Sequence, residues 1–310
     1  MSETPIVTAV IPTRNRPQLV VNAVRSALEQ TFQRVEVIVV VDGPDAVTER
    51  ALAEVDDPRL RTIVLQKNAG GANARNVGIA AALGKWIALL DDDDEWLPQK
   101  TEVQLAIAQQ SRHQFPVISS RFVARMPNCE YVWPRRLPAP GENISNYLFS
   151  RRTLFQGEGV MATPTLLARK ELLLQLPFRP HLKKHEDWDW VIRAAQLDGV
   201  GFEFSAEPLA IVRIGAGRKG MSNSDDWRFS LGWIRERRDC VSPRAYASFI
   251  LTVVADQASR QATLTEYVNL PRESWRHGQP NLLDFLLYIG MRLFPRNLRH
   301  DLRRRFKAYA

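Results

Sequence analysis

Four consecutive aspartates, Asp91 to Asp94, are the residues of this sequence whose type and spacing point most clearly to chemistry. They come directly after the apolar stretch 86–90, which has the composition of a buried strand. Ligands of open α/β sheets bind at the carboxyl ends of the strands. Carboxylates fixed there suit a hard divalent cation, which takes oxygen ligands and shares them with a substrate phosphate. The run therefore predicts a Mg²⁺ or Mn²⁺ site that holds a phosphorylated substrate.

Polar and basic residues follow the first apolar run of the chain, residues 6–11. Pro12 ends this run, and Thr13, Arg14 and Arg16 come soon after it. A nucleotide can lie at this edge of a sheet. A polar turn between a strand and a helix would explain Pro12 but not both arginines, so we predict that this segment binds a nucleotide.

Two further charged residues are candidates for the same ligand. Asp42 ends the Val/Ile-rich run 35–41, where a carboxylate can accept hydrogen bonds from a base or a ribose. A turn or helix-cap aspartate is the alternative, because the following Gly43 and Pro44 favour turns. Arg75 lies among small residues that allow close approach, so its guanidinium can reach a base or a phosphate. A surface salt bridge is the alternative for Arg75.

The elements that must position these residues alternate between strand and helix. Strand-like runs at 6–11, 35–41, 62–65 and 86–90 are separated or followed by helical patterns at 17–28, 73–83 and 98–110. Repeated βα units predict a parallel sheet with right-handed crossovers. In the less regular part that follows, we expect a proline-broken loop at 127–145, a helix from Glu186, and a strand pair at 201–204 and 209–214. Beyond residue 224 only helical patterns occur.

The order of these motifs resembles that of inverting, GT-A-type nucleotide-sugar glycosyltransferases of family 2. The resemblance covers roughly residues 5–215 and rests on five motifs together. These are Val10-Ile11-Pro12-Thr13-Arg14-Asn15-Arg16, Val39-Val40-Val41-Asp42-Gly43, Asn68-Ala69-Gly70-Gly71-Ala72-Asn73-Ala74-Arg75-Asn76, Leu90-Asp91-Asp92-Asp93-Asp94-Glu95-Trp96 and Glu186-Asp187-Trp188.

The resemblance implies an α/β GT-A fold, which is a Rossmann-like, mostly parallel sheet flanked by helices. We expect a catalytic domain over residues 1–220, with a nucleotide-binding half at 1–114 and an acceptor-binding half at 115–220. A helical C-terminal extension over 221–310 would follow.

The resemblance also implies roles for residues of the donor site. Asp93 would be the direct ligand of Mn²⁺ or Mg²⁺. The alternative for the acidic run is a cap for the following helix, but a helix cap needs one carboxylate and not four. The residues expected to bind the donor nucleotide are Pro12, Thr13, Arg14, Arg16, Asp42, Asn68, Arg75, Asp91, Asp92 and Arg213. Many relatives add a histidine after the last strand, but Arg213 is followed by Ile214 and Gly215. Water and phosphate oxygens would then complete the metal shell, which Mg²⁺ accepts.

The acceptor side is implied by the pair Glu186-Asp187 at the start of a helix. Asp187 would be the general base that deprotonates the acceptor hydroxyl, and Glu186 would orient it or bind acceptor hydroxyls. The helix dipole alone would also favour acids in this first turn. His185 and Trp188 are candidate acceptor contacts, although we expect either Trp188 or Trp190 to belong to the core.

The C-terminal extension combines an apolar stripe with a basic end. Leu282, Phe285, Leu286, Ile289 and Leu293 fall on one side of a helix, and residues 292–310 hold seven Lys/Arg against one Asp. Residues 281–310 therefore fit a helix lying in an anionic membrane interface. A homodimer interface, or packing on the catalytic domain, is the alternative. No nucleic-acid-binding motif accompanies the charge, so we expect no nucleic acid partner.

The bulk properties restrict the class of protein. The 310 residues are 45% hydrophobic and carry a net charge of +8, with two cysteines, which cannot build a disulfide framework. The sequence starts without a signal-peptide pattern, and no apolar stretch reaches the roughly 18–20 residues of a membrane span. We expect a cytoplasmic protein, or one peripheral on the inner face of the plasma membrane.

The predicted function is the metal-dependent, inverting transfer of a sugar from a nucleoside diphosphate, with UDP expected, to a hydroxyl of a glycan or lipid-linked acceptor. The setting implied by the resemblance is bacterial surface-polysaccharide or glycolipid assembly. One alternative is a nucleotidyltransferase that makes nucleotide sugars, although its usual glycine-rich loop is missing from residues 12–16. The other is an inactive carbohydrate-binding or scaffold protein, against which Asp42, Asp93 and Asp187 together argue.

Overall fold

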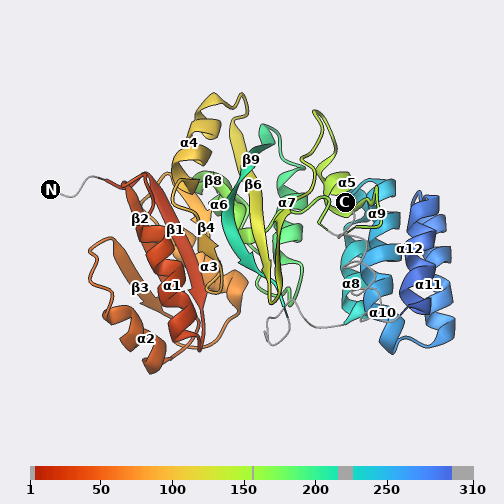
Figure 1. The fold of residues 1–310 in the computed structure, drawn as a ribbon, viewed down its shortest axis with the longest axis horizontal. Coiled ribbons are helices and arrows are strands. Elements are labelled where there is room, and N and C mark those ends of the chain that lie inside the picture. Colours follow the sequence, from red (N-terminus) through yellow and green to blue (C-terminus); the bar gives the residue numbers. More distant parts are fainter. Residues whose placement is uncertain (1–3, 156, 216–225, 295–310) are drawn as a thin grey trace. The chain divides into compact units, whose positions relative to one another are not determined.

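The computed structural model describes residues 4–155, 157–215 and 226–294, and its chain divides into two compact units (Figure 1). Unit 1 comprises residues 1–137 and 161–220, and unit 2 comprises residues 138–160 and 221–310. The sequence prediction assigned all of 1–220 to one domain. The structure instead groups 138–160 with the C-terminal helices.

The first half of unit 1 is a parallel sheet whose strands end at one common edge. The strands are, in spatial order, β3 (Leu60–Val64), β2 (Val35–Val41), β1 (Val7–Thr13) and β4 (Trp86–Leu89). Every residue of β2 is buried, as expected for a parallel strand covered on both faces. The connecting helices are α1 (Pro17–Leu28), α2 (Ala46–Ala53) and α3 (Gly71–Ala81). The predicted βα alternation is therefore confirmed.

Small residues let α3 approach the sheet closely. Gly78 faces β1 and β2, and a Cβ atom there would lie 2.5 Å from Val10 Cγ1 and 3.2 Å from Val40 Cγ2. Ala72 and Ala74 are buried on the same helix. This close packing fixes the position of α3 and, with it, the position of Arg75.

The second half of unit 1 extends the sheet with strands of mixed direction. Next to β4 lie β8 (Leu167–Arg169), β6 (Phe115–Met126), β9 (Val200–Arg213) and β5 (Glu95–Trp96), and β7 (Cys129–Trp133) pairs with β6. Only the β6–β9 pair among these is parallel. The helices are α4 (Lys100–Gln110), α6 (Lys170–Gln175) and α7 (Glu186–Ala194), with a short 3-10 helix at Thr163–Thr165.

Two predictions for this half are wrong. The stretch 127–145, expected to be a loop, contains β7, because Pro127 lies before this strand and Pro134, Pro138 and Pro140 follow its last residue. The expected strand pair at 201–204 and 209–214 is one strand, β9, whose pairing with β6 shifts register near Arg121. Such a bulge absorbs residues without ending the strand.

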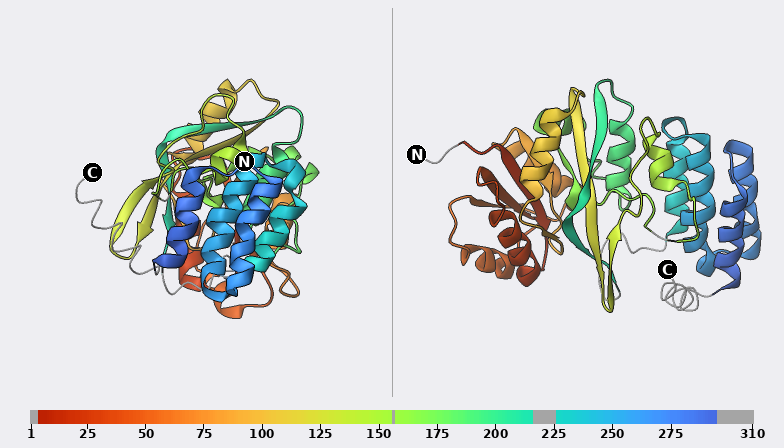
Figure 2. Two further views of the ribbon diagram at one scale, coloured as in Figure 1. Left: turned by 90° about the vertical axis from the view of Figure 1, so that its right-hand side faces the viewer. Right: turned by 45° about the horizontal axis from the view of Figure 1, so that its top comes forward.

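Unit 2 is helical around an aromatic core. It contains α5 (Ile144–Phe149), α8 (Trp227–Glu236), a 3-10 helix (Arg238–Cys240), α9 (Pro243–Phe249), a π-helix (Ile250–Val254), α10 (Ala255–Gln261), α11 (Leu264–His277) and α12 (Leu282–Leu293). Figure 2 shows the C-terminal helices side by side. The rings of Phe149, Trp233 and Phe249 pack with centroids 5.0–6.2 Å apart. The expected helical extension is confirmed.

Within the described ranges, no helix combines the length and the apolar character that crossing a membrane would require.

Candidate active site

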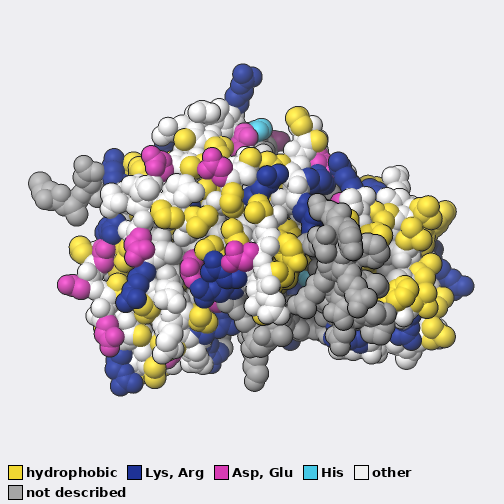
Figure 3. All heavy atoms as spheres, in the orientation of Figure 1, with side chains coloured by type: hydrophobic (Ala, Val, Ile, Leu, Met, Phe, Trp, Pro, Cys, Tyr) yellow, Lys and Arg dark blue, Asp and Glu magenta, His cyan; other side chains and the backbone are white. Residues whose placement is uncertain are grey.

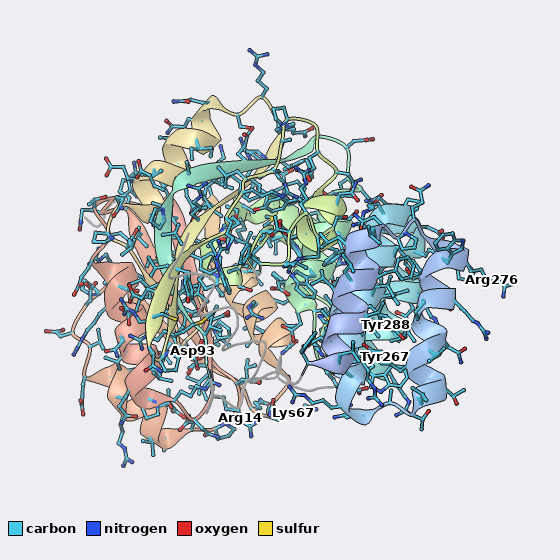
Figure 4. The ribbon with its side chains drawn as sticks, turned by 45° about the vertical axis from the view of Figure 1, so that its right-hand side comes forward. Arg14, Lys67, Asp93, Tyr267, Arg276 and Tyr288 are labelled. Atoms are coloured by element: carbon cyan, nitrogen blue, oxygen red, sulfur yellow. The ribbon has the colours of Figure 1, made fainter. Side chains whose placement is uncertain are left out.

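The candidate site lies where the parallel strands of unit 1 end. Thr13 pairs with Val41, and Val41 pairs with Val64, so the segments after β1, β2 and β3 leave the same edge. Figure 4 shows Arg14, Lys67 and Asp93 along this edge. Lys67 was not among the predicted residues, although a basic residue just after a strand of this sheet is a usable signal.

Two aspartates of the acidic run hold the run itself in place. Asp92 accepts hydrogen bonds from Thr13 Oγ1 and Arg16 Nη1, both at 2.8 Å. Burial raises the pKa of Asp92, and the guanidinium of Arg16 opposes this rise. Asp94 accepts the backbone N–H of Arg213 at 2.9 Å. The predicted donor contact Asp92 thus bonds to the protein itself in this structure, and Asp94 ties the run to the end of β9.

Arg75 connects the acidic run to the start of α7. Its Nη2 donates to Asp91 Oδ1 at 2.6 Å, and its Nη1 donates to Glu186 Oε2 at 2.8 Å. Burial alone would lower the pKa of Arg75, but the carboxylates of Asp91 and Glu186 raise it above its ordinary value. The sequence predicted a nucleotide contact for Arg75. The structure gives it two carboxylate partners, one of them 111 positions away.

Asp187 lies beside this bridge in the first turn of α7. Its Oδ1 accepts the backbone N–H of Trp188 at 2.8 Å. Burial raises the pKa of Asp187, while this hydrogen bond and the charge of Arg75 oppose the rise. Burial likewise raises the pKa of Glu186 against the charge of Arg75. A carboxyl group with a raised pKa is a stronger proton acceptor, which suits a general base.

The aromatic residues around Asp187 differ in burial, with His185 and Trp190 buried and Trp188 half-buried. His185 precedes α7 with a left-handed φ of 65°, and its ring stacks on Trp188 with centroids 4.9 Å apart. Trp190 is 1% exposed and donates to the carbonyl of Leu176 at 2.8 Å. Trp190 is therefore the core tryptophan of the pair, and Trp188 is half-buried.

Asp42 and Asn68 shape the loop that leads into α3. The two carboxylate oxygens of Asp42 accept the backbone N–H groups of Ala69 and Gly70, at 2.7 and 2.9 Å. Asn68 Oδ1 also accepts the N–H of Gly70, at 3.1 Å. These bonds match a turn-forming role. Because each carboxylate oxygen has a second lone pair, nucleotide contact by Asp42 stays a prediction.

The predicted basic residues differ in their surroundings. Arg14 is exposed and Pro12 is half-buried just before it. Arg16 pairs with Asp92 and lies 3.4 Å from Asp93. Arg213 ion-pairs with Glu95, a partner that the sequence prediction did not consider.

The acidic run offers a suitable but incomplete set of metal ligands. Among the residues that the structure describes, no three His, Cys, Asp or Glu side chains form a ready metal site. Asp91 and Asp93 provide hard carboxylate oxygens, and Mg²⁺ is commonly held by one or two carboxylates together with substrate phosphates and water. The donor set therefore fits a cation that arrives with a diphosphate.

Comparison with known proteins identifies the family. The profile of the family described as "Glycosyl transferase family 2" matches residues 8–176, more than half of the 310 residues. The chain belongs to this family. It is therefore a glycosyltransferase, and the enzyme class predicted from the motifs is confirmed.

Similar proteins cover this glycosyltransferase to different extents. The amylovoran biosynthesis glycosyltransferase AmsB of Erwinia amylovora is 28% identical over 275 residues, which is 83% of this chain and 87% of AmsB. The succinoglycan biosynthesis protein ExoO of Rhizobium meliloti is 35% identical over 156 residues, 48% of this chain and 45% of ExoO.

Solved structures confirm the fold of the glycosyltransferase. A crystal structure of S. aureus TarS 1–349 in complex with UDP-GlcNAc superposes with a TM-score of 0.61 at 19% identity, over 86% of this chain and 79% of that one. A crystal structure of S. aureus TarS matches 92% of this chain but only 52% of its own, at 19% identity and a TM-score of 0.58. The GT-A fold with a helical C-terminal region is thereby established.

Proposed function

We propose that this enzyme is an inverting glycosyltransferase that moves a sugar from a UDP-type nucleoside diphosphate donor to a hydroxyl group of a glycan or lipid-linked acceptor. The observation that carries the proposal is the bridge from Asp91 through Arg75 to Glu186. It keeps the donor-side aspartate and the acidic start of α7 together. A direct displacement needs a donor and a base within reach of the same hydroxyl group.

The similar proteins support the substrate classes. AmsB and ExoO are named for the biosynthesis of amylovoran and succinoglycan, and the TarS structure holds UDP-GlcNAc. By analogy we propose a UDP-sugar donor and a role in bacterial surface-polysaccharide assembly.

In the proposed reaction Asp187 is the base. The acceptor oxygen forms a bond to the anomeric carbon while its proton passes to the carboxylate of Asp187. The bond between the anomeric carbon and the diphosphate oxygen breaks, and its electron pair leaves with the nucleoside diphosphate. Attack from the side opposite the leaving group inverts the anomeric configuration. In this proposal Glu186, which accepts a hydrogen bond from Arg75, orients the acceptor hydroxyl.

Asp93, assisted by Asp91, is the proposed ligand of Mn²⁺ or Mg²⁺. When bound, the cation offsets the negative charge that develops on the leaving diphosphate. Arg14 and Lys67 are exposed at the same edge of the sheet, where they can add positive charge next to the phosphates.

A thermal-shift panel of nucleoside diphosphates with and without Mn²⁺ tests the donor site. The matching nucleotide should raise the unfolding midpoint, because a ligand that binds only the native state stabilises it by mass action. Asp93→Asn should remove the part of the shift that depends on metal. Asp56→Asn, at an exposed aspartate of unit 1, is the matched control and should keep it. If no nucleotide shifts the midpoint, the donor assignment is wrong.

A turnover assay tests the base. With a productive donor and acceptor, Asp187→Asn should lower kcat by about 10²–10⁴-fold while the nucleotide shift persists. Release of nucleoside diphosphate and a product of inverted anomeric configuration are expected. Release of pyrophosphate, or retention of configuration, would contradict the proposed reaction.

A further inference from the structure

An exposed apolar surface covers the last two helices of unit 2. Large apolar side chains recur at helical spacing on α11 and on α12, which places each set on one side of its helix. Their exposed fractions run from 49% to 75%. Figure 3 shows hydrophobic side chains gathered over these helices. We name this set the apolar surface; it consists of Leu264, Val268, Trp275, Leu282, Leu286, Ile289 and Leu293.

The two helices hold this surface in one fixed arrangement. The rings of Tyr267 and Tyr288 stack between α11 and α12 with centroids 4.5 Å apart. Each hydroxyl donates to the other residue's carbonyl oxygen, at 2.9 and 2.8 Å. Trp275 and Phe285 adjoin, with ring centroids 6.1 Å apart. Because the tyrosines occupy the inner faces, the apolar side chains of both helices remain outside.

The charge next to the apolar surface is positive. Arg272 and Arg276 are exposed on α11, and Figure 4 shows Arg276 pointing outward. Of the segment 281–310 predicted to lie on a membrane, residues 295–310, with six Lys/Arg against one Asp, lie outside the described residues.

The acids of the two helices do not cancel this charge, because each has a basic partner within unit 2. The pairs are Glu266 with Arg228, Glu273 with Arg235 and Asp284 with Arg244.

We propose that the apolar surface, with the exposed Arg272 and Arg276 beside it, binds the surface of a lipid bilayer with anionic headgroups. Apolar side chains at helical spacing, flanked by basic residues, enter the headgroup region, while anionic lipids neutralise the arginines. A second copy of the chain fits less well, since a two-fold contact would bring the same positive charges together. The proposal is independent of the enzymatic reaction, because binding to vesicles requires no donor.

Vesicle sedimentation tests the proposal with the full chain. The protein should pellet with vesicles of equal parts phosphatidylcholine and phosphatidylglycerol, but weakly with phosphatidylcholine alone. Salt should weaken the anionic binding, because it screens exposed charges. Trp275→Ser/Leu286→Ser/Ile289→Ser should lower the affinity by roughly tenfold or more, because three apolar side chains no longer enter the interface.

The matched control is Leu83→Ser/Leu174→Ser, which alters leucines of unit 1 that are 64% and 51% exposed. This variant should bind as the wild type does. A charge variant, Arg272→Gln/Arg276→Gln, should lose about fivefold in affinity for each charge removed. Circular dichroism melts establish that all variants fold, which is expected because the altered apolar side chains lie on the surface.

Three results would overturn the proposal. In the first, the wild type does not pellet with anionic vesicles, and in the second, the apolar variant pellets as well as its control. In the third, light scattering finds a wild-type dimer that the apolar variant converts to a monomer, and vesicles do not bind the wild type. That result would assign the apolar surface to a second copy of the chain.

Discussion

Replacing Arg75 by glutamine should both lower the free energy of unfolding and change the pKa of the candidate base, Asp187. Arg75 is 12% exposed and donates to Asp91 and Glu186, which are 29% and 12% exposed. Breaking a buried ion pair typically costs about 3–5 kcal/mol, because the remaining charge loses its partner. Since Asp91 is partly solvated, we expect Arg75→Gln to lower the free energy of unfolding by about 2–4 kcal/mol.

The same substitution should raise the pKa of Glu186 and of Asp187 further. In the wild type, the positive charge of Arg75 opposes the rise in these pKa values that burial causes, and the variant lacks this charge. A carboxyl group whose folded-state pKa is raised stabilises the fold below its unfolded pKa and loses this contribution as the pH rises. The destabilisation by Arg75→Gln should therefore be larger at about pH 8 than at about pH 5. The acid limb of the pH–rate profile should move to higher pH, since the base must be deprotonated.

Denaturant unfolding at the two pH values, together with a pH–rate profile of donor turnover, measures both effects. Arg125→Gln is the matched control, because Arg125 and its partner Glu130 are 40% and 52% exposed. An exposed pair of this kind contributes about 1 kcal/mol or less. The double variant Arg75→Gln/Glu186→Gln should recover part of the lost stability. If Arg75→Gln leaves both stability and the acid limb unchanged, the bridge does not hold the site together.

Two further predictions concern the elements that support the site. Gly78→Ala should lower the free energy of unfolding by about 1–3 kcal/mol in denaturant melts, because its Cβ would lie 2.5 Å from Val10 Cγ1. The control Gly232→Ala, whose Cβ would meet no atom within 4 Å, should instead raise the free energy of unfolding by about 0.5–1 kcal/mol. Equal effects of the two substitutions would refute the close approach of α3 to the sheet. Burial lowers the pKa of Lys100 to about 7, from an ordinary value of 10.5, so its contribution to stability is greatest above the ordinary value and is lost as the pH falls toward 7. Relative to Lys100→Met, the wild type should therefore gain up to about 1.4 kcal/mol per pH unit between about pH 7 and 9 in thermal melts, and parallel curves would show that Lys100 is not buried in its neutral form.

The sequence alone determined the elements whose pattern is local. The Val/Ile run of β2, the glycine-containing helix α3 and the helices after residue 226 follow from composition and periodicity within a short window. The motif order likewise indicated the family, the enzyme class and the edge of the sheet where polar residues gather. Those inferences need no knowledge of distant contacts.

The sequence did not predict the irregular strands β7 and β9 correctly, because such strands are defined by the strands they pair with. β7 exists through its ladder with β6, and β9 remains one strand because its bulge is accommodated by the same partner. Neither partner is visible in local periodicity. The grouping of residues 138–160 with the C-terminal helices is equally non-local, since it depends on contacts such as that between Phe149 and Trp233.

Only the tertiary structure determined which partner each acidic residue binds. In sequence Asp91 to Asp94 are equivalent neighbours, but in the structure their side chains have different partners. Asp91 bonds to Arg75, Asp92 bonds to Thr13 and Arg16, and Asp94 accepts the backbone N–H of Arg213. The bridge between Arg75 and Glu186 joins residues 111 positions apart. Residue types thus specify which charges are present, whereas the packing of α3 and α7 in unit 1 determines which of them meet.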